Sequence, residues 1–243
     1  MSHQNKPEER AYPQAFDRQH RKFLTRQVVF AFFGLAIIAL GLFLVLGRGD
    51  DKKGSATTTS KPAESPAKSG VEAVDMGLSV SWASCNVGAE SATADGDYFA
   101  WGEVTPSDSY VWRNSSTYDK RLSGDVLPPA NDASTQLGEG WRMPTIEEFD
   151  ELVTKCEWRL LQHDGRYGYE VTATNGNSIF LPASGYIYDT TPSHGDLEGL
   201  YWCSNIVTDG DSKHATTFRF NNREFYFDSL YRYYGAQIRA VRE

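Results

Sequence analysis

The pattern of apolar and polar positions divides the chain into unlike stretches. Residues 28–47 form an apolar run of twenty residues without a charge, and residues 49–70 contain no aromatic or large aliphatic side chain. After residue 74 the pattern changes to short alternating segments between Gly, Asn and Asp residues, which is typical of strands and turns. We therefore predict a basic tail (1–26), a transmembrane helix (27–47), a flexible Ser/Thr/Pro/Lys linker (48–73) and one folded domain (74–243).

The apolar run is long enough to cross a bilayer. At about 1.5 Å of rise per residue it spans roughly 30 Å, the thickness of the hydrocarbon core. A cleaved secretory signal is the alternative, but its apolar core is shorter and ends at a small-residue cleavage site, which is missing here. Arg18, Arg21, Lys22 and Arg26 precede the run, and basic flanks stay in the cytoplasm. We expect an uncleaved single-pass anchor in the inner (cell) membrane, with a periplasmic or extracellular C-terminal domain.

Most of the folded domain has a strand-like pattern. The Asn-Gly-Asn sequence at 175–177 separates two such segments and predicts a hairpin, because Asn and Gly tolerate the backbone of a tight turn. Further strands are predicted at 78–82, 98–101, 179–188, 216–220 and 236–241.

One segment, which begins at Thr145, predicts a helix. Thr145 is placed to cap it, and Glu148 stands three residues later to complete a capping box. The apolar residues that follow recur at helical spacing and would give the helix one face toward the sheet. These residues are Ile146, Phe149, Leu152, Val153 and Cys156.

The charge of the folded part limits its partners. Residues 71–243 carry thirteen Lys and Arg against twenty-six Asp and Glu, a net charge of −13. Phosphate backbones are bound by clustered Lys and Arg, so we expect no nucleic-acid partner. Cations and neutral ligands such as sugars remain compatible with this charge. Arg142, Arg239 and Arg242 are expected to be structural and to pair with some of the excess carboxylates.

Six segments of the folded domain together form a recognisable pattern. They are VDMGLSVSWASCNVGA (74–89), GDYFAWGEVTP (96–106), GWRMPTIEEFDEL (140–152), NGNSIFLPASGY (175–186), GLYWCSN (199–205) and YGAQIRAVR (234–242). In this order they resemble the Fibrobacter succinogenes major paralogous domain, a family common in Bacteroidetes envelope proteins. The resemblance covers nearly all of residues 74–243 and implies an α+β, C-type-lectin-like domain with short irregular antiparallel strands and one or two helices. Two of the segments are also similar to elements of formylglycine-generating enzymes.

Three cysteines follow the predicted anchor. In an oxidising compartment, one disulfide and one spare thiol is the simplest arrangement, and three buried thiols are the alternative. The resemblance favours Cys85 with Cys156, because both fall where the family often carries Cys, whereas Cys203 does not.

The sequence offers no positive sign of catalysis. The local cysteine motif of formylglycine-generating enzymes is missing, the histidines lack metal-ligand spacing, and no GxSxG elbow is present. We expect a protein that is not an enzyme and that has no cofactor. A structural calcium is the alternative. Asp95 and Asp97 are the calcium candidates, because calcium takes six to eight oxygen ligands, although loop carboxylates that cap turns are the alternative.

Tyrosines give the clearest indication of binding. Tyr226, Tyr231, Tyr233 and Tyr234 crowd one segment, and Tyr186 with Tyr188 mark a second. Rings of this kind stack on sugars or are buried at protein interfaces, and a position in the core is the alternative. The leading hypothesis is a membrane-tethered, non-enzymatic module that binds a protein or glycan of the envelope. A structural subunit of an inner-membrane assembly is second, and a divergent formylglycine-type enzyme is third.

Overall fold

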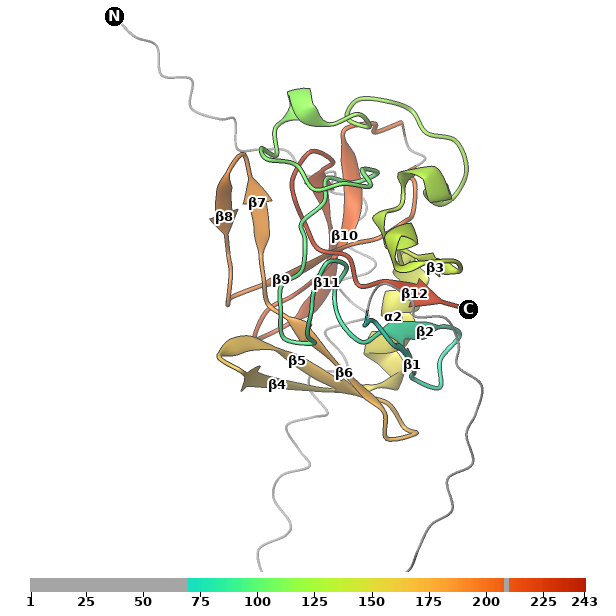
Figure 1. Cartoon of the computed structure of the whole chain (residues 1–243), viewed down its shortest axis with the longest axis vertical. Coiled ribbons are helices and arrows are strands. Elements are labelled where there is room, and N and C mark those ends of the chain that lie inside the picture. Colours follow the sequence, from blue (N-terminus) through green and yellow to red (C-terminus); the bar gives the residue numbers. More distant parts are fainter. Residues whose placement is uncertain (1–69, 208–209) are drawn as a thin grey trace, which may run out of the picture.

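Short strands supply most of the regular structure of the domain (Figure 1). The structure, a computed structural model, describes residues 70–207 and 210–243. In chain order, the elements are β1 (Ala73–Asp75), β2 (Ser81–Ala83), the 3-10 helices η1 (Trp112–Asn114), η2 (Pro129–Asn131) and η3 (Ala133–Leu137), β3 (Trp141–Arg142), α2 (Ile146–Lys155), β4 (Glu157–His163), β5 (Arg166–Thr172), β6 (Ser178–Pro182), β7 (Tyr186–Tyr188), β8 (Thr191–Ser193), β9 (Gly199–Trp202), β10 (His214–Phe220), β11 (Phe225–Tyr231) and β12 (Val241–Arg242).

The predicted basic tail, transmembrane helix and nearly all of the predicted linker lie outside the described residues. Within residues 70–207 and 210–243, no helix has both the length and the apolar character needed to span a bilayer. The anchor therefore stays a prediction.

The expected α+β, C-type-lectin-like class is wrong. The part of the chain that the structure describes has a single α-helix of ten residues among twelve strands, so the domain is mostly β. The physical reason lies in the two longest hairpins, β4–β5 and β10–β11, whose strands each have seven residues. Both hairpins turn at polar residues and pair along their full length, so sheet outweighs helix in the domain.

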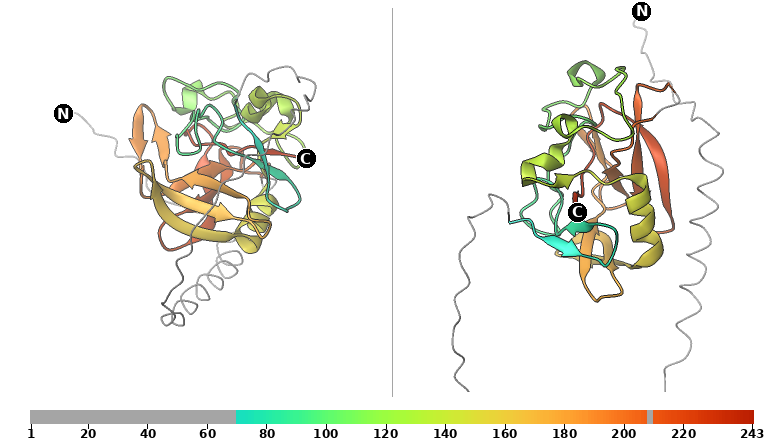
Figure 2. Two further views of the ribbon diagram at one scale, coloured as in Figure 1. Left: turned by 60° about the horizontal axis from the view of Figure 1, so that its bottom comes forward. Right: turned by 90° about the vertical axis from the view of Figure 1, so that its right-hand side faces the viewer.

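The strands form four antiparallel sheets. The four-stranded sheet has the order β1-β2-β12-β3, so the C-terminal strand lies between elements from the start and the middle of the domain. Two three-stranded sheets have the orders β11-β10-β9 and β4-β5-β6, and β7 pairs with β8 alone. In Figure 1 the β4-β5-β6 sheet lies at the bottom, the β7–β8 hairpin at the left and the 3-10 segments at the top, and Figure 2 gives two further views.

The predicted strands agree best with the structure where a short turn joins two neighbouring strands. The Asn-Gly-Asn hairpin is confirmed: β5 and β6 pair from Thr172 with Ser178, and Gly176 has a φ of +89°. The strand predicted at 216–220 lies within β10, while the one at 179–188 is split into β6 and β7 at Gly185. Residues 98–101 and 236–240 form no strand and contribute only isolated bridges, such as the one between Phe99 and Ala236.

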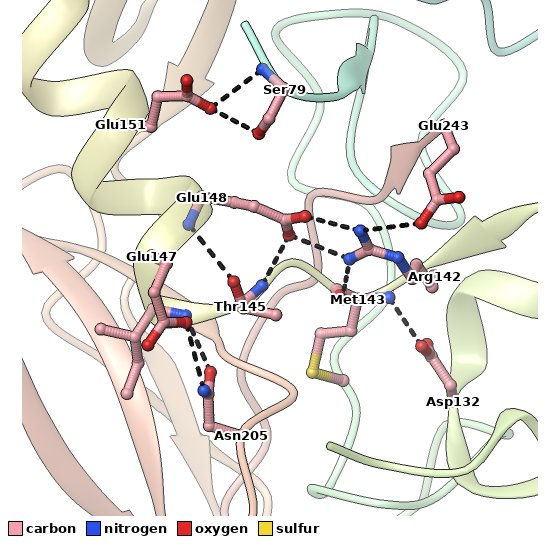
Figure 3. A network of polar contacts seen from close by, with 11 residues as sticks. Ser79, Asp132, Arg142, Met143, Thr145, Glu147, Glu148, Glu151, Asn205 and Glu243 are labelled. Atoms are coloured by element: carbon pink, nitrogen blue, oxygen red, sulfur yellow. Dashed lines mark hydrogen bonds and ion pairs between the residues drawn. The ribbon is translucent and has the colours of Figure 1, made fainter. Parts of the chain in front are cut away.

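The capping box of α2 is confirmed (Figure 3). Thr145 Oγ1 accepts a hydrogen bond from Glu148 N at 3.3 Å, and Glu148 Oε2 accepts one from Thr145 N at 2.8 Å. The same carboxylate binds Arg142 through two nitrogens, at 2.5 and 2.9 Å. Glu148 is therefore buried without being unpaired, and it fixes the start of the helix to the end of β3.

The apolar face of α2 packs on the sheets as predicted. Phe149 stacks on Phe218 of β10, with ring centroids 4.5 Å apart, and Trp82 of β2 lies 5.1 Å from the same ring. A second cluster of buried residues, the second core, lies beneath the loops on the other side of β9. It includes Trp101 and Trp202, whose indole N–H groups donate to the carbonyls of Cys203 and Phe99.

Candidate functional site

Six tyrosines from three separate segments of the chain meet on one surface of the domain. We call this group the tyrosine cluster. It combines the loop before η2, strand β7, the last residue of β11 and the turn that follows β11. Its members are Tyr118, Tyr186, Tyr188, Tyr231, Tyr233 and Tyr234.

The rings of the tyrosine cluster are in mutual contact. Tyr231 stacks on Tyr233 with centroids 5.3 Å apart, and Tyr118 meets Tyr233 edge to face at 5.1 Å. Tyr234 then links this half to β7, because it stacks on Tyr186 at 5.5 Å and lies 5.0 Å from Tyr188. The cluster is therefore a continuous aromatic surface rather than a set of isolated side chains.

The tyrosine cluster is partly buried and partly exposed to solvent. Tyr186 and Tyr234 pack against the second core with one side. Tyr188 and Tyr231 are 46% and 37% exposed, so the outer edge of the cluster reaches solvent. Buried support beneath and exposed rings above is the arrangement expected of a binding surface.

Arg232, between Tyr231 and Tyr233, fixes the cluster from below. It is 1% exposed, and its guanidinium lies over the Trp101 ring at 4.5 Å. Its N–H groups donate to the carbonyls of Lys120 at 2.9 Å and His214 at 3.0 Å. These bonds attach the loop that carries Tyr118 to the end of β10 and hold the rings in position.

A small cavity adjoins the cluster at Tyr233. Its volume is about 130 Å³. Tyr233 and Tyr110 contribute rings, and the remaining walls are mostly polar or small. They are Ala100, Glu103, Thr105, Pro106, Ser107, Ser109, Val111, Asn114 and Ser115.

The ring of Tyr110 packs so closely against the backbone of Gly235 that this position has no room for a side chain. A Cβ added to Gly235 would lie 2.9 Å from the Tyr110 ring. The Tyr110 hydroxyl donates to the carbonyl of Tyr98, and burial raises the pKa of Tyr110, helped by the charges of Asp97 and Asp108. The ring is therefore a fixed, neutral wall of the cavity.

Burial keeps the hydroxyl groups of Tyr118, Tyr233 and Tyr234 neutral at all ordinary pH values. Burial raises the pKa of Tyr234 to about 12, with further effect from the neighbouring tyrosines. Burial also raises the pKa of Tyr233 well above its usual value and that of Tyr118 to a lesser extent. These groups can therefore donate as well as accept hydrogen bonds to a ligand.

The structure separates Tyr226 from the other three tyrosines predicted with it. Tyr226 stands at the other end of β11, where its hydroxyl donates to Glu198 and its cross-strand partner is Arg219. Burial raises its pKa, and the bond to the Glu198 carboxylate adds to this effect. Tyr231, Tyr233 and Tyr234 are brought together as expected, whereas Tyr226 belongs to a different polar group.

The two calcium candidates have different environments. Asp95 binds Arg166 at 2.8 Å and accepts a hydrogen bond from Ser184 Oγ at 2.6 Å. Asp97 lies against Gly88, and burial raises its pKa. Across the residues described, no group of three or more His, Cys, Asp or Glu side chains is arranged to hold a metal ion. Asp95 thus has the role of a structural ion-pair partner here.

The cysteines do not form the disulfide suggested by the family resemblance. All three are free thiols. Cys85 Sγ donates to the carbonyl of Ala89, while Cys156 packs at the edge of the core beneath α2. Burial raises the pKa of each thiol, most strongly at Cys203, so all three are protonated and unreactive at neutral pH.

The three arginines expected to be structural behave in three ways. Arg142 pairs with Glu148, as expected. Arg239 is fully buried and pairs with no carboxylate of the residues that the structure describes: it donates to Asn86 Oδ1 and to the carbonyls of Ala83 and Phe180. Arg242 lies over the Trp141 ring at 6.0 Å.

Sequence reasoning missed several members of the site. Tyr118 and Tyr110 are single tyrosines in polar loops, and nothing local distinguishes them. Trp112 could have been identified from the sequence, because a tryptophan amid polar residues is unusual. It is 56% exposed at the start of η1, beside the cavity walls Val111 and Asn114.

Comparison with known proteins gives no relative for this chain. No family model, no curated protein and no solved structure matches it. The resemblance to the Fibrobacter succinogenes family therefore stays a prediction, and the function rests on the site itself.

Proposed function

We propose that this domain is a non-enzymatic carbohydrate-binding module and that its ligand stacks on the tyrosine cluster. One observation carries the proposal: six tyrosines from separate segments form a continuous, partly exposed surface beside a polar cavity.

The combination of rings and polar groups favours a sugar. A pyranose ring has an apolar C–H face and a rim of hydroxyl groups, so it requires an aromatic face next to hydrogen-bonding partners. Tyr188 and Tyr231 offer exposed rings, while Ser107, Ser109 and Asn114 in the cavity offer hydroxyl and amide groups.

The proposed setting is the cell envelope. The predicted helix at 27–47 would hold the domain at the inner membrane, and the linker at 48–73 would let it move on the order of 25 Å from that surface. The ligand would then be a glycan within reach of the membrane.

The test compares two equally exposed tyrosines in the full-length protein. Tyr188 is 46% exposed in the cluster, and Tyr167, on β5 outside the cluster, is 45% exposed. Tyr188→Ala should lower the affinity for the glycans of an array of envelope and plant glycans by about tenfold or more. The affinity should be retained in Tyr167→Ala. Absence of any glycan signal from the wild-type protein, or equal loss in both variants, would overturn the proposal.

A further inference from the structure

We propose that the cavity beside Tyr233 selects a ligand with a positively charged amino group, and that Glu103 is the residue that determines this specificity. The inference rests on the proposed carbohydrate-binding function and narrows its ligand to an amino sugar whose amine is not acetylated. It is carried by the cavity's composition, which combines aromatic rings with a carboxylate and has no cation.

Glu103 has one oxygen engaged and one available. Oε1 accepts a hydrogen bond from Ser116 N at 2.5 Å, which fixes the carboxylate in the cavity wall. Oε2 makes no hydrogen bond or ion pair with any residue that the structure describes. A fixed carboxylate with an open oxygen is suited to accept a charge-assisted hydrogen bond from an ammonium group.

Further carboxylates lie near the cavity. Asp108 lies between the wall residues Ser107 and Ser109, and with Asp97 it raises the pKa of Tyr110. Asp189 accepts a hydrogen bond from the Ser109 hydroxyl at 2.5 Å. None of the cavity-lining residues is Lys, Arg or His. The charge of the lining itself therefore favours a cation over uronic and sialic acids.

Two basic residues adjoin wall residues in sequence, and both are engaged elsewhere. Arg232, next to Tyr233, lies over the Trp101 ring and donates to backbone carbonyls. The other is Arg113, next to Asn114. Its guanidinium lies over the Trp112 ring, 5.6 Å from the centroid. It is also not among the cavity-lining residues. It does not neutralise Glu103 by an ion pair of its own, since no such pair forms among the described residues.

The rings complete the recognition of an ammonium group. Tyr110 and Tyr233 both line the cavity, and the face of a tyrosine ring attracts a cation within about 6 Å. A metal ion is a poorer occupant, because calcium requires six to eight oxygens and one cavity carboxylate falls short of that. At about 130 Å³ the cavity has room for an amino substituent and its nearest atoms, while the sugar ring stacks on the tyrosines outside.

The experiment titrates the full-length protein with three oligosaccharides by calorimetry. These are a glucosamine oligomer, its fully N-acetylated counterpart and a galacturonate oligomer. We expect the glucosamine oligomer to bind about tenfold or more tightly than the acetylated one, and the galacturonate oligomer not to bind. Added salt should weaken the first interaction selectively.

The variant Glu103→Gln tests the residue itself. Gln keeps an oxygen for the Ser116 N–H, so the fold should be retained. Glucosamine affinity should fall by about tenfold, to the level of the acetylated oligomer, whose own affinity should not change. Glu224→Gln, an exposed residue in the β10–β11 turn, is the matched control and should behave like the wild type.

The outcomes separate the two proposals. Equal binding of glucosamine and acetylated oligomers, or an unchanged glucosamine preference in Glu103→Gln, would overturn the inference and leave carbohydrate binding intact. Failure of every oligosaccharide, together with a blank glycan array, would overturn the proposed function and the inference with it.

Discussion

The guanidinium of Arg232 lies 4.5 Å from the centroid of the Trp101 ring, with both side chains buried. The hydrogen bonds of Arg232 go to the backbone carbonyls of Thr117, Lys120, Asp211 and His214. These carbonyls belong to the 117–120 loop and to the 211–214 segment. The pair therefore joins the second core to the loops that carry the tyrosine cluster.

Removing the donors of Arg232 should be costly. In Arg232→Met the ring contact keeps its apolar part, but the carbonyls of Lys120 and His214 lose their partners in a buried environment. We expect a loss of about 2–4 kcal/mol in the free energy of unfolding, measured by urea denaturation. Arg223→Met, at an exposed turn, should change it by less than about 0.5 kcal/mol. Similar values for both variants would contradict the role given to Arg232.

The helix cap allows a smaller and sharper test. Thr145→Ala removes the oxygen that accepts from Glu148 N and should destabilise the domain by about 1 kcal/mol. Thr145→Ser retains a hydroxyl at the same position and should recover most of the loss. If Ser and Ala prove equally destabilising, the side-chain bond does not stabilise the helix start.

Gly235 tests the packing of the cavity wall. A methyl group there would lie 2.9 Å from the Tyr110 ring, so Gly235→Ala should displace the ring and cost about 1–3 kcal/mol. Ligand affinity should fall as well, because the displaced ring closes or reshapes the cavity. Gly195→Ala is the control, since its nearest atom lies 4.0 Å away. A stable Gly235→Ala protein that retains full affinity would show that the cavity is not used.

The tyrosines predict how stability changes at alkaline pH. Burial raises the pKa of Tyr98 and of Tyr234 to about 12, against an ordinary value of 10.0. In this range the unfolded chain can release these protons and the folded domain cannot. Their contribution is therefore complete below pH 10.0 and is lost as the pH rises toward about 12. Tyr98→Phe should reduce this slope in denaturation experiments across the range, and a flat stability profile would contradict the burial of these groups.

Local signals in the sequence were sufficient for some elements. The cap at Thr145 and the turn at Asn175–Asn177 each depend on residues within a few positions of one another, and both are confirmed. The order of the strands was not predicted, because the pairing of β12 with β2 and β3 depends on contacts between distant segments. Nothing in a local pattern fixes such pairing.

The site was predicted in part for the same reason. Tyr231, Tyr233 and Tyr234 are neighbours in sequence, but Tyr118 joins them from more than a hundred residues away, through a loop that Arg232 holds. The sequence alone could have separated Tyr226 from the other three tyrosines. It stands five positions before Tyr231 on one strand, and an odd spacing places side chains on opposite faces.

The most direct test of the account is to locate the ligand on the domain. Tyrosine ring resonances of the full-length protein would be followed by NMR during titration with the glucosamine oligomer, and assigned with single Tyr→Phe variants. The account predicts shifts for Tyr188, Tyr231 and Tyr233 and none for Tyr167 or Tyr226. Shifts confined to Tyr167 or Tyr226, or none at saturating oligomer, would contradict the claim that the tyrosine cluster is the binding surface.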